Sequence, residues 1–252
     1  MPRCTLDPTV GLHRPCPSDA GQASVRHIRN VSCARTQGIY STPLPFDSLK
    51  QDFLLAVQNN DVVLLSGETG SGKSTRAAST VLDDANRRRV DARVLVTEPR
   101  RLAAITLASR VAEERNDVIS SNRDTSVGYV VRHDRNPPQP TNSILFATEG
   151  CALQLLRGSA TGLSQGPSFT HILLDEAHER NIETDILLFY CLLLLLNTDA
   201  PRPKIVLMSA TMELEKFRTY FRDFAVSSIS VGGTPYPVDH YFLGDLSVPS
   251  TL

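Results

Sequence analysis

The chain has 252 residues, and at about 150 residues per domain this length predicts one large domain or one domain with a tail. Hydrophobic residues make up 41% and charged residues 21%, which are ordinary values for a soluble globular protein. They exclude a fully disordered, collagen-like or disulfide-scaffold chain. A formal net charge of −1 argues against a strongly basic DNA-coating protein, although a local basic groove would still suffice for nucleic acid.

The N-terminal residues differ in amino-acid composition from the rest of the chain. Residues 1–43 hold five arginines and two aspartates, no Lys or Glu, and prolines without helical periodicity. We interpret them as a disordered N-terminal extension, with an organellar transit peptide as the alternative.

The longest apolar run, Ile186 to Leu196, has 11 residues, whereas a membrane-spanning helix needs about 20. Five cysteines without paired or metal-like spacing favour a reducing compartment, cytoplasmic or nuclear.

From residue 44 onward, strand-like and helix-like segments alternate. In chain order we expect a helix over 46–59, a strand over 61–66, a glycine loop over 67–74, a helix over 75–82, a strand over 93–97, a helix over 101–115, a strand over 143–147, a helix over 150–156, a strand over 171–174, a helix over 183–196, a strand over 204–208 and a helix over 212–221. Apolar strands alternating with helices predict an α/β fold with a mainly parallel sheet and helices on both faces. We assign this domain to residues 44–231 and a following linker to residues 232–252.

The glycine loop carries the first chemical signal. GETGSGKS, from Gly67 to Ser74, fits the pattern G-x-x-x-x-G-K-[ST] between a strand and a helix. Its glycines let backbone N–H groups surround phosphate oxygens, Lys73 adds a positive charge, and the Ser74 hydroxyl suits Mg²⁺. A dinucleotide loop is excluded, because its third glycine would fall at Thr75. The residues expected to bind the nucleotide here are Gly67, Glu68, Thr69, Gly70, Ser71, Gly72, Lys73, Ser74 and Thr75.

Two adjacent carboxylates follow a later strand. In HILLDEAH, Asp175 and Glu176 stand at the carboxyl end of an apolar strand, which in a parallel sheet faces the same crevice as the phosphate loop. Asp175 can hold magnesium there, and Glu176 can orient and deprotonate an attacking water. A strand that ends in a solvated acidic turn is the alternative for such a pair taken alone.

Further segments complete a family pattern. Besides the phosphate loop and Asp175–His178, the chain has TEPRRLAA over 97–104, TEG over 148–150 and SAT over 209–211. VGY over 127–129 with Arg132 is another typical segment. In this order the motifs resemble the DEAH-box RNA helicases of superfamily 2, and the likeness runs from about residue 44 to 243. The resemblance implies a RecA-like P-loop NTPase fold, specifically the N-terminal RecA-like lobe, with ATP or other NTPs and Mg²⁺ as cofactors.

The resemblance also implies roles for individual residues. Lys73, Asp175 and Glu176 would be catalytic, with Ser74 and Asp175 as magnesium ligands. The positions that would couple the nucleotide state to lobe movement are His178, Ser209 and Thr211. Those that would contact the RNA backbone are Arg100, Arg101 and Thr148, and Arg110 would stack on the nucleotide base.

Several positions depart from the family pattern. Arg76 stands where glutamine is commoner, and His133-Asp134 replaces an aromatic-acid pair. Glu98 also replaces a frequent glutamine, and we expect it to add a negative charge beside the RNA track.

The 252 residues contain no run of the Gln-Arg-x-x-Arg-x-Gly-Arg type, which the family carries on its second RecA-like lobe. We therefore expect an ATP-dependent RNA helicase lobe whose partners are RNA, a second lobe in cis or trans, and a G-patch-type activator. The alternative is a non-catalytic truncated paralogue that acts as a nucleotide- or RNA-binding regulatory module. A metabolic kinase or transporter ATPase would share only the phosphate loop.

Overall fold

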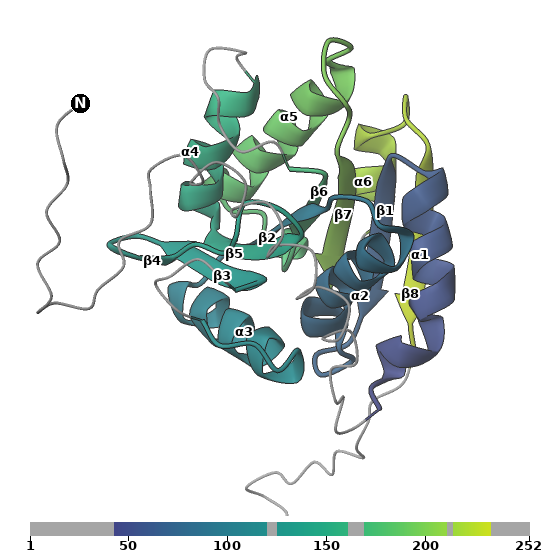
Figure 1. Ribbon diagram of the computed structural model, residues 1–252. Helices are drawn as coiled ribbons and strands as arrows, with labels where there is room; N and C mark the ends of the chain where they lie inside the picture. The colour runs from purple at the N-terminus through teal and green to yellow at the C-terminus, as the bar shows by residue number, and fades with distance from the viewer. Residues whose placement is uncertain (1–42, 120–124, 161–168, 211–213, 233–252) are drawn as a thin grey trace, which may run out of the picture. The chain divides into compact units, whose positions relative to one another are not determined.

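The computed structural model describes residues 43–119, 125–160, 169–210 and 214–232. The predicted extension therefore lies outside the described residues except for residue 43, and the predicted linker lies outside except for residue 232. In the described part, one sheet lies between helices on both of its faces (Figure 1). Its strands are β1 (Val62–Gly67), β2 (Arg93–Glu98), β3 (Val127–Val131), β4 (Asp134–Asn136), β5 (Ser143–Thr148), β6 (His171–Leu174), β7 (Lys204–Ser209) and β8 (Val226–Val231). The helices are α1 (Lys50–Asn59), α2 (Lys73–Arg88), α3 (Arg101–Glu114), α4 (Glu149–Ala160), α5 (Ile182–Leu196) and α6 (Leu214–Tyr220), with short 3-10 turns at Pro45–Leu49 and Ala177–Glu179.

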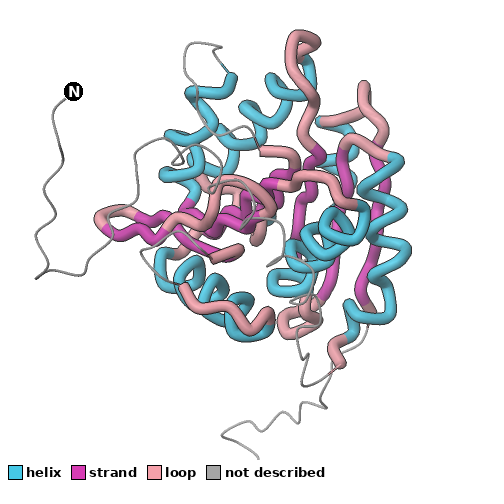
Figure 2. Tube along the Cα trace, viewed as in Figure 1, coloured by secondary structure: helices cyan, strands magenta, loops and turns pink. Residues whose placement is uncertain are grey.

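The sheet places several chain segments at one edge. Its strand order is β4-β3-β5-β2-β6-β7-β1-β8, and every neighbouring pair except β3–β4 is parallel. Figure 2 shows these strands as one continuous layer. Because parallel strands end on the same side, the segments after β1, β2, β5, β6 and β7 meet along the carboxyl edge. The register aligns Ser66 with Ser209 and Glu98 with Thr148.

Side chains that alternate in direction along each strand explain why helices cover both faces of the sheet. Val63 and Leu65 of β1 belong to a core shared with α1, α2 and α3, whereas Val62 and Leu64 pack in a second core with α4, α5 and α6. Successive residues of a strand point to opposite faces, so a strand buried on both sides must be apolar throughout. The predicted α/β fold with helices on both faces is confirmed.

The predicted elements are confirmed with shifted ends. The helix expected over 46–59 begins as the 3-10 turn at Pro45–Leu49, and the helix expected over 75–82 is longer, running over Lys73–Arg88. Three strands were not predicted, namely β3, β4 and β8. Each lies toward an edge of the sheet, and β4 and β8 carry polar residues that edge strands tolerate. No helix within the described ranges is long and apolar enough to cross a membrane.

Candidate functional site

The phosphate loop joins β1 to α2 by a tight left-handed path. Gly70 and Gly72 have φ angles of 83° and 92°, a region that residues with a Cβ rarely adopt. Lys73 opens α2 and is only 3% exposed. Its Nζ lies 3.5 Å from the Glu68 carbonyl oxygen. The loop therefore surrounds an ammonium group at a helix N-terminus, which is a site suited to an anion.

A segment before the sheet holds the loop from outside. The Phe46 N–H donates to the Ser71 carbonyl oxygen at 3.0 Å. A methyl group on Gly72 would lie 2.8 Å from Leu44 Cδ1, so the glycine is required by contact as well as by its φ angle. This support involves residues that sequence reasoning did not assign to the site. The apolar Leu44 and Phe46 before the first helix were its only signal.

The two carboxylates stand on the same edge as the phosphate loop. Asp175 follows β6 directly and is 1% exposed, and its N–H donates to the Thr97 carbonyl oxygen at 3.1 Å. One Asp175 carboxylate oxygen accepts the Glu176 N–H at 2.9 Å. Glu176 has a φ angle of 50°, and its Oε2 lies 3.4 Å from His178 Nδ1. The turn thus buries the first carboxylate and leaves the second partly exposed, at 31% of its side chain.

Ser209 fills the position between these segments. It ends β7, which lies between β1 and β6, and its side chain is buried. The sheet therefore brings the phosphate loop, Ser209 and Asp175 to the carboxyl ends of three adjacent strands. Thr211, the other coupling residue expected in that segment, lies outside the described residues.

Glu98 corrects one expectation. It ends β2 beside the Asp175 turn and is 3% exposed, so it does not lie on a surface track. Burial, the neighbouring charge of Asp175 and a hydrogen bond to that carboxylate raise the pKa of Glu98 to about 9. The raised pKa reflects the cost of ionising two buried carboxylates in contact, so Glu98 gives up its proton less readily than a solvated glutamate. The sequence gave no sign of this pairing, since a strand-end glutamate is usually solvated.

The donor groups suit a magnesium nucleotide better than a protein-only metal cage. Among the described residues, no group of three or more His, Cys, Asp or Glu side chains could hold a metal ion. Mg²⁺ commonly keeps waters and binds through one or two protein oxygens plus substrate phosphates. The Ser74 hydroxyl at the start of α2 and the buried Asp175 carboxylate supply oxygens of this kind.

A hollow of about 270 Å³ opens beside the phosphate loop. It is lined by Gly70, Lys73, Ser74 and Thr75 from the loop and α2, by Leu44 from the preceding segment, and by Leu107, Arg110 and Glu114 from α3. Arg110 Nε donates to Glu114 Oε1 at 2.8 Å. The structure therefore brings Arg110 to the same hollow as the loop. Glu114 was not predicted, because as one of two glutamates at a helix end it reads as a solvated residue.

The three expected RNA contacts lie along the same carboxyl edge, as two exposed arginines and a half-buried threonine. Arg100 and Arg101 stand where β2 passes into α3 and both are exposed. The Arg100 side chain is 77% exposed and pairs with Glu179 at 2.9 Å. Thr148 ends the neighbouring strand β5. The two arginines are thus open to solvent, whereas Lys73 and Asp175 on the same edge are buried.

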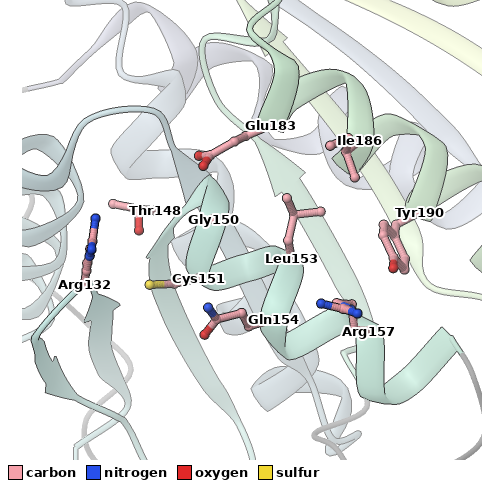
Figure 3. Close-up of a pocket in the computed structure, with 10 residues that line it drawn as sticks. All are labelled: Arg132, Thr148, Gly150, Cys151, Leu153, Gln154, Arg157, Glu183, Ile186 and Tyr190. Carbon is pink, nitrogen blue, oxygen red and sulfur yellow. The ribbon is translucent and has the colours of Figure 1, made fainter.

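Thr148 opens onto a groove of about 730 Å³ between α4 and α5. Figure 3 shows Arg132 and Thr148 at one end, Cys151 and Gln154 of α4 below them, and Tyr190 of α5 at the far end. Behind Thr148, Glu149 is buried and accepts hydrogen bonds from Thr184 Oγ1 at 2.6 Å and Asn181 Nδ2 at 2.7 Å. This link ties the Thr148 segment to the helix that follows the DEAH turn, and sequence reasoning missed it.

Comparison with known proteins agrees with this geometry. Residues 49–219 match the DEAD/DEAH box helicase family, which is more than half of the chain. The chain belongs to that family. ATP-dependent RNA helicase DHX30 of Gallus gallus is 38% identical over 208 residues, covering 82% of this chain and 16% of the relative.

Two further relatives give the same family assignment. ATP-dependent DNA/RNA helicase DHX36 of Rattus norvegicus is 37% identical over 206 residues, covering 81% of this chain and 20% of the relative. DExH-box ATP-dependent RNA helicase DExH2 of Arabidopsis thaliana is 36% identical over 221 residues, covering 87% of this chain and 13% of the relative. The chain thus spans between 13% and 20% of the length of these helicases. Its membership in the DEAH-box branch and its RecA-like P-loop fold confirm the resemblance read from the motifs.

Proposed function

We propose that this chain is the first RecA-like lobe of a DEAH-box RNA helicase, which binds and hydrolyses ATP and couples this reaction to RNA binding. One observation carries the proposal: the phosphate loop, Ser209 and the Asp175–Glu176 turn occupy the carboxyl ends of the adjacent strands β1, β7 and β6. The relatives, which are named as ATP-dependent RNA or DNA/RNA helicases, agree with it.

The nucleotide chemistry follows from the residues at this edge. The loop amides and Lys73 would hold the β- and γ-phosphates at the N-terminus of α2. The Ser74 hydroxyl and the Asp175 carboxylate would hold Mg²⁺, which neutralises phosphate charge when bound. Glu176, which is partly exposed, would orient the attacking water and accept its proton. His178, whose Nδ1 lies 3.4 Å from Glu176 Oε2, would couple the nucleotide state to movement of the second lobe, together with Ser209 and Thr211.

The RNA part of the proposal uses the two exposed arginines and the half-buried Thr148. Arg100, Arg101 and Thr148 would contact the RNA backbone, since guanidinium and hydroxyl groups suit phosphate oxygens. A second RecA-like lobe, in cis or in trans, would supply the arginines that compensate transition-state charge, an effect of about 10³–10⁵-fold in rate. A G-patch-type activator would be a further partner, and the site of action would be cytoplasmic or nuclear.

The test is ATP turnover by the purified chain, with and without single-stranded RNA and with an added second lobe, beside the Glu176→Gln variant. Turnover that RNA stimulates and Glu176→Gln abolishes would support the helicase lobe, because glutamine keeps the shape but accepts no proton. Nucleotide and RNA binding with no turnover, even with the second lobe present, would favour the regulatory module instead. Absence of nucleotide binding would contradict the proposal.

A further inference from the structure

Two ion pairs connect α2 to α3 and its C-terminal end, and only one of them borders the hollow beside the phosphate loop. Arg76 Nη1 lies 2.8 Å from Glu114 Oε2, and both side chains are almost fully buried, at 2% and 6% exposure. Seven residues further along α2, Asp83 Oδ1 lies 2.7 Å from Nη1 of Arg115, the residue that follows the end of α3. The first pair borders the hollow beside the phosphate loop, because Glu114 lines it. The residues lining that hollow include neither Asp83 nor Arg115.

Glu114 uses its second oxygen for another arginine. Its Oε1 accepts from Arg110 Nε at 2.8 Å, while the Arg110 side chain is 54% exposed at the hollow. An isolated surface pair with i,i+4 spacing is weak, since both side chains lose rotamer freedom when they pair. Here Glu114 is already fixed by Arg76, so only Arg110 has freedom to lose. A buried carboxylate thus serves as a rigid anchor for an exposed guanidinium.

Arg76 connects this anchor to the phosphate loop. It lies in the first turn of α2, which Lys73 opens. Its Nε also lies 3.6 Å from Asp47 Oδ1, on the segment whose Phe46 N–H holds the Ser71 carbonyl oxygen. The distance between the phosphate loop and Arg110 is therefore set by one continuous set of ion pairs and hydrogen bonds.

We propose that Arg76 and Glu114 are positioning residues that hold the Arg110 guanidinium over the base end of the nucleotide site. This inference rests on the proposed function, because it assumes that a nucleotide occupies the phosphate loop. Arg110 stacks on the face of the nucleobase, with Leu44 and Leu107 as the apolar lining of the hollow. Pre-arrangement removes the cost of ordering the arginine when the nucleotide binds.

The experiment separates the base from the phosphates. The affinities of ATP and of tripolyphosphate, which lacks base and ribose, are measured by calorimetry in Mg²⁺ with the full chain. Arg110→Ala is expected to lower the preference for ATP over tripolyphosphate by about fivefold, the size of one cation–π contact. Glu114→Gln is expected to lower the same preference by a similar factor and to leave tripolyphosphate affinity unchanged. Combining both substitutions should cause no further loss, because they remove one interaction.

Two further variants keep the test decisive. Should Glu114→Gln fail to fold because it leaves Arg76 buried without its partner, the double variant Arg76→Gln/Glu114→Gln replaces the ion pair with two neutral amides. Asp83→Asn is the matched control, because it weakens the other α2–α3 ion pair without touching the hollow. It should lower stability and leave the preference for ATP unchanged.

Three results would overturn the inference. Loss of the preference in Arg110→Ala but not in either Glu114 variant would mean that Glu114 does not position the arginine. An equal loss in Asp83→Asn would mean that α2–α3 packing in general is responsible. Absence of ATP and tripolyphosphate binding to the unsubstituted chain would overturn both this inference and the proposed function, whereas the first two results leave the proposed function intact.

Discussion

The two sides of the carboxyl edge are built differently. On the nucleotide side, Lys73, Asp175 and Ser209 are buried, and neighbouring backbone groups or ion pairs fix the segments that carry them. On the side expected to face RNA, Arg100 and Arg101 are exposed, and Arg100 forms a surface ion pair with Glu179. Substitutions on the first side should therefore affect both folding and binding. On the second side they should affect binding alone.

The largest effect is expected for Arg76→Ala. Removing the guanidinium takes a buried partner from Glu114 and leaves a cavity between α2 and α3. We expect the free energy of unfolding to fall by about 3 kcal/mol, toward the lower end for a broken buried pair because Glu114 keeps Arg110. Urea denaturation measures this change.

The control for Arg76→Ala lies on the same helix. Arg87 is 63% exposed and 3.7 Å from Asp84, so Arg87→Ala should change the free energy of unfolding by less than about 0.5 kcal/mol. An equal fall in the free energy of unfolding for both substitutions would contradict the expectation that buried residues near the phosphate loop contribute more to stability than exposed ones.

His171, at the opposite, amino edge of the sheet, should make the free energy of unfolding depend on pH. Burial, with the positive charge of Lys204, lowers the pKa of His171 to about 4, and Asp84 offsets this in part. A histidine with a lowered folded-state pKa takes up its proton more readily when unfolded. Stability is therefore full above the unfolded pKa of about 6.5 and falls as the pH drops toward 4, by up to about 3 kcal/mol.

Denaturant midpoints between pH 4 and pH 7 check this expectation. In His171→Gln the decline over this range should be clearly shallower, because the substituted side chain does not titrate. A decline of the same steepness in both proteins would show that other groups cause the acid sensitivity.

The smallest effect is expected for Arg101→Ala on the exposed side. We expect stability to stay within about 0.5 kcal/mol and RNA affinity to fall a few-fold. The slope of log affinity against log salt should decrease by about 0.7 for one lost phosphate contact with single-stranded RNA. Fluorescence anisotropy with labelled RNA at several salt concentrations gives both values.

Arg222→Ala is the matched control, since Arg222 is also exposed, 76% by side chain, but lies between α6 and β8 near the amino ends of the strands. It should leave the affinity and the salt slope unchanged. An equal loss in both variants would indicate diffuse attraction to positive charge rather than a defined RNA edge.

The sequence was sufficient to predict those elements whose own residues indicate their structure. The central strands are apolar on both faces, and each glycine, lysine and serine of the phosphate loop has a chemical reason that a pattern can express. For this reason the pattern predicted β1, β2, β5, β6 and β7, which the structure confirms, and the glycine loop that joins β1 to α2. Their meeting at one edge follows from the parallel direction of the strands.

Other features depend on pairs of residues distant in the sequence. Glu98 looks like a surface charge until β2 and β6 pair and bury it against Asp175. Arg76 and Glu114 are separated by 38 positions, and neither shows alone that it is buried. The edge strands β4 and β8 were missed because their polar residues resemble loops. In each of these cases the burial or pairing of a residue depends on contacts with distant parts of the chain, which a local sequence pattern does not contain.

The most direct test of the account is calorimetric binding of Mg²⁺ with ATP to the 252-residue chain and to its Lys73→Ala variant. We predict measurable binding to the unsubstituted chain and at least about a tenfold loss of affinity in the variant, the value of one charge-assisted contact to phosphate. Thermal unfolding of both proteins shows whether the variant is folded. Equal affinity of two folded proteins for ATP would contradict the assignment of the Gly67–Ser74 loop as the nucleotide site.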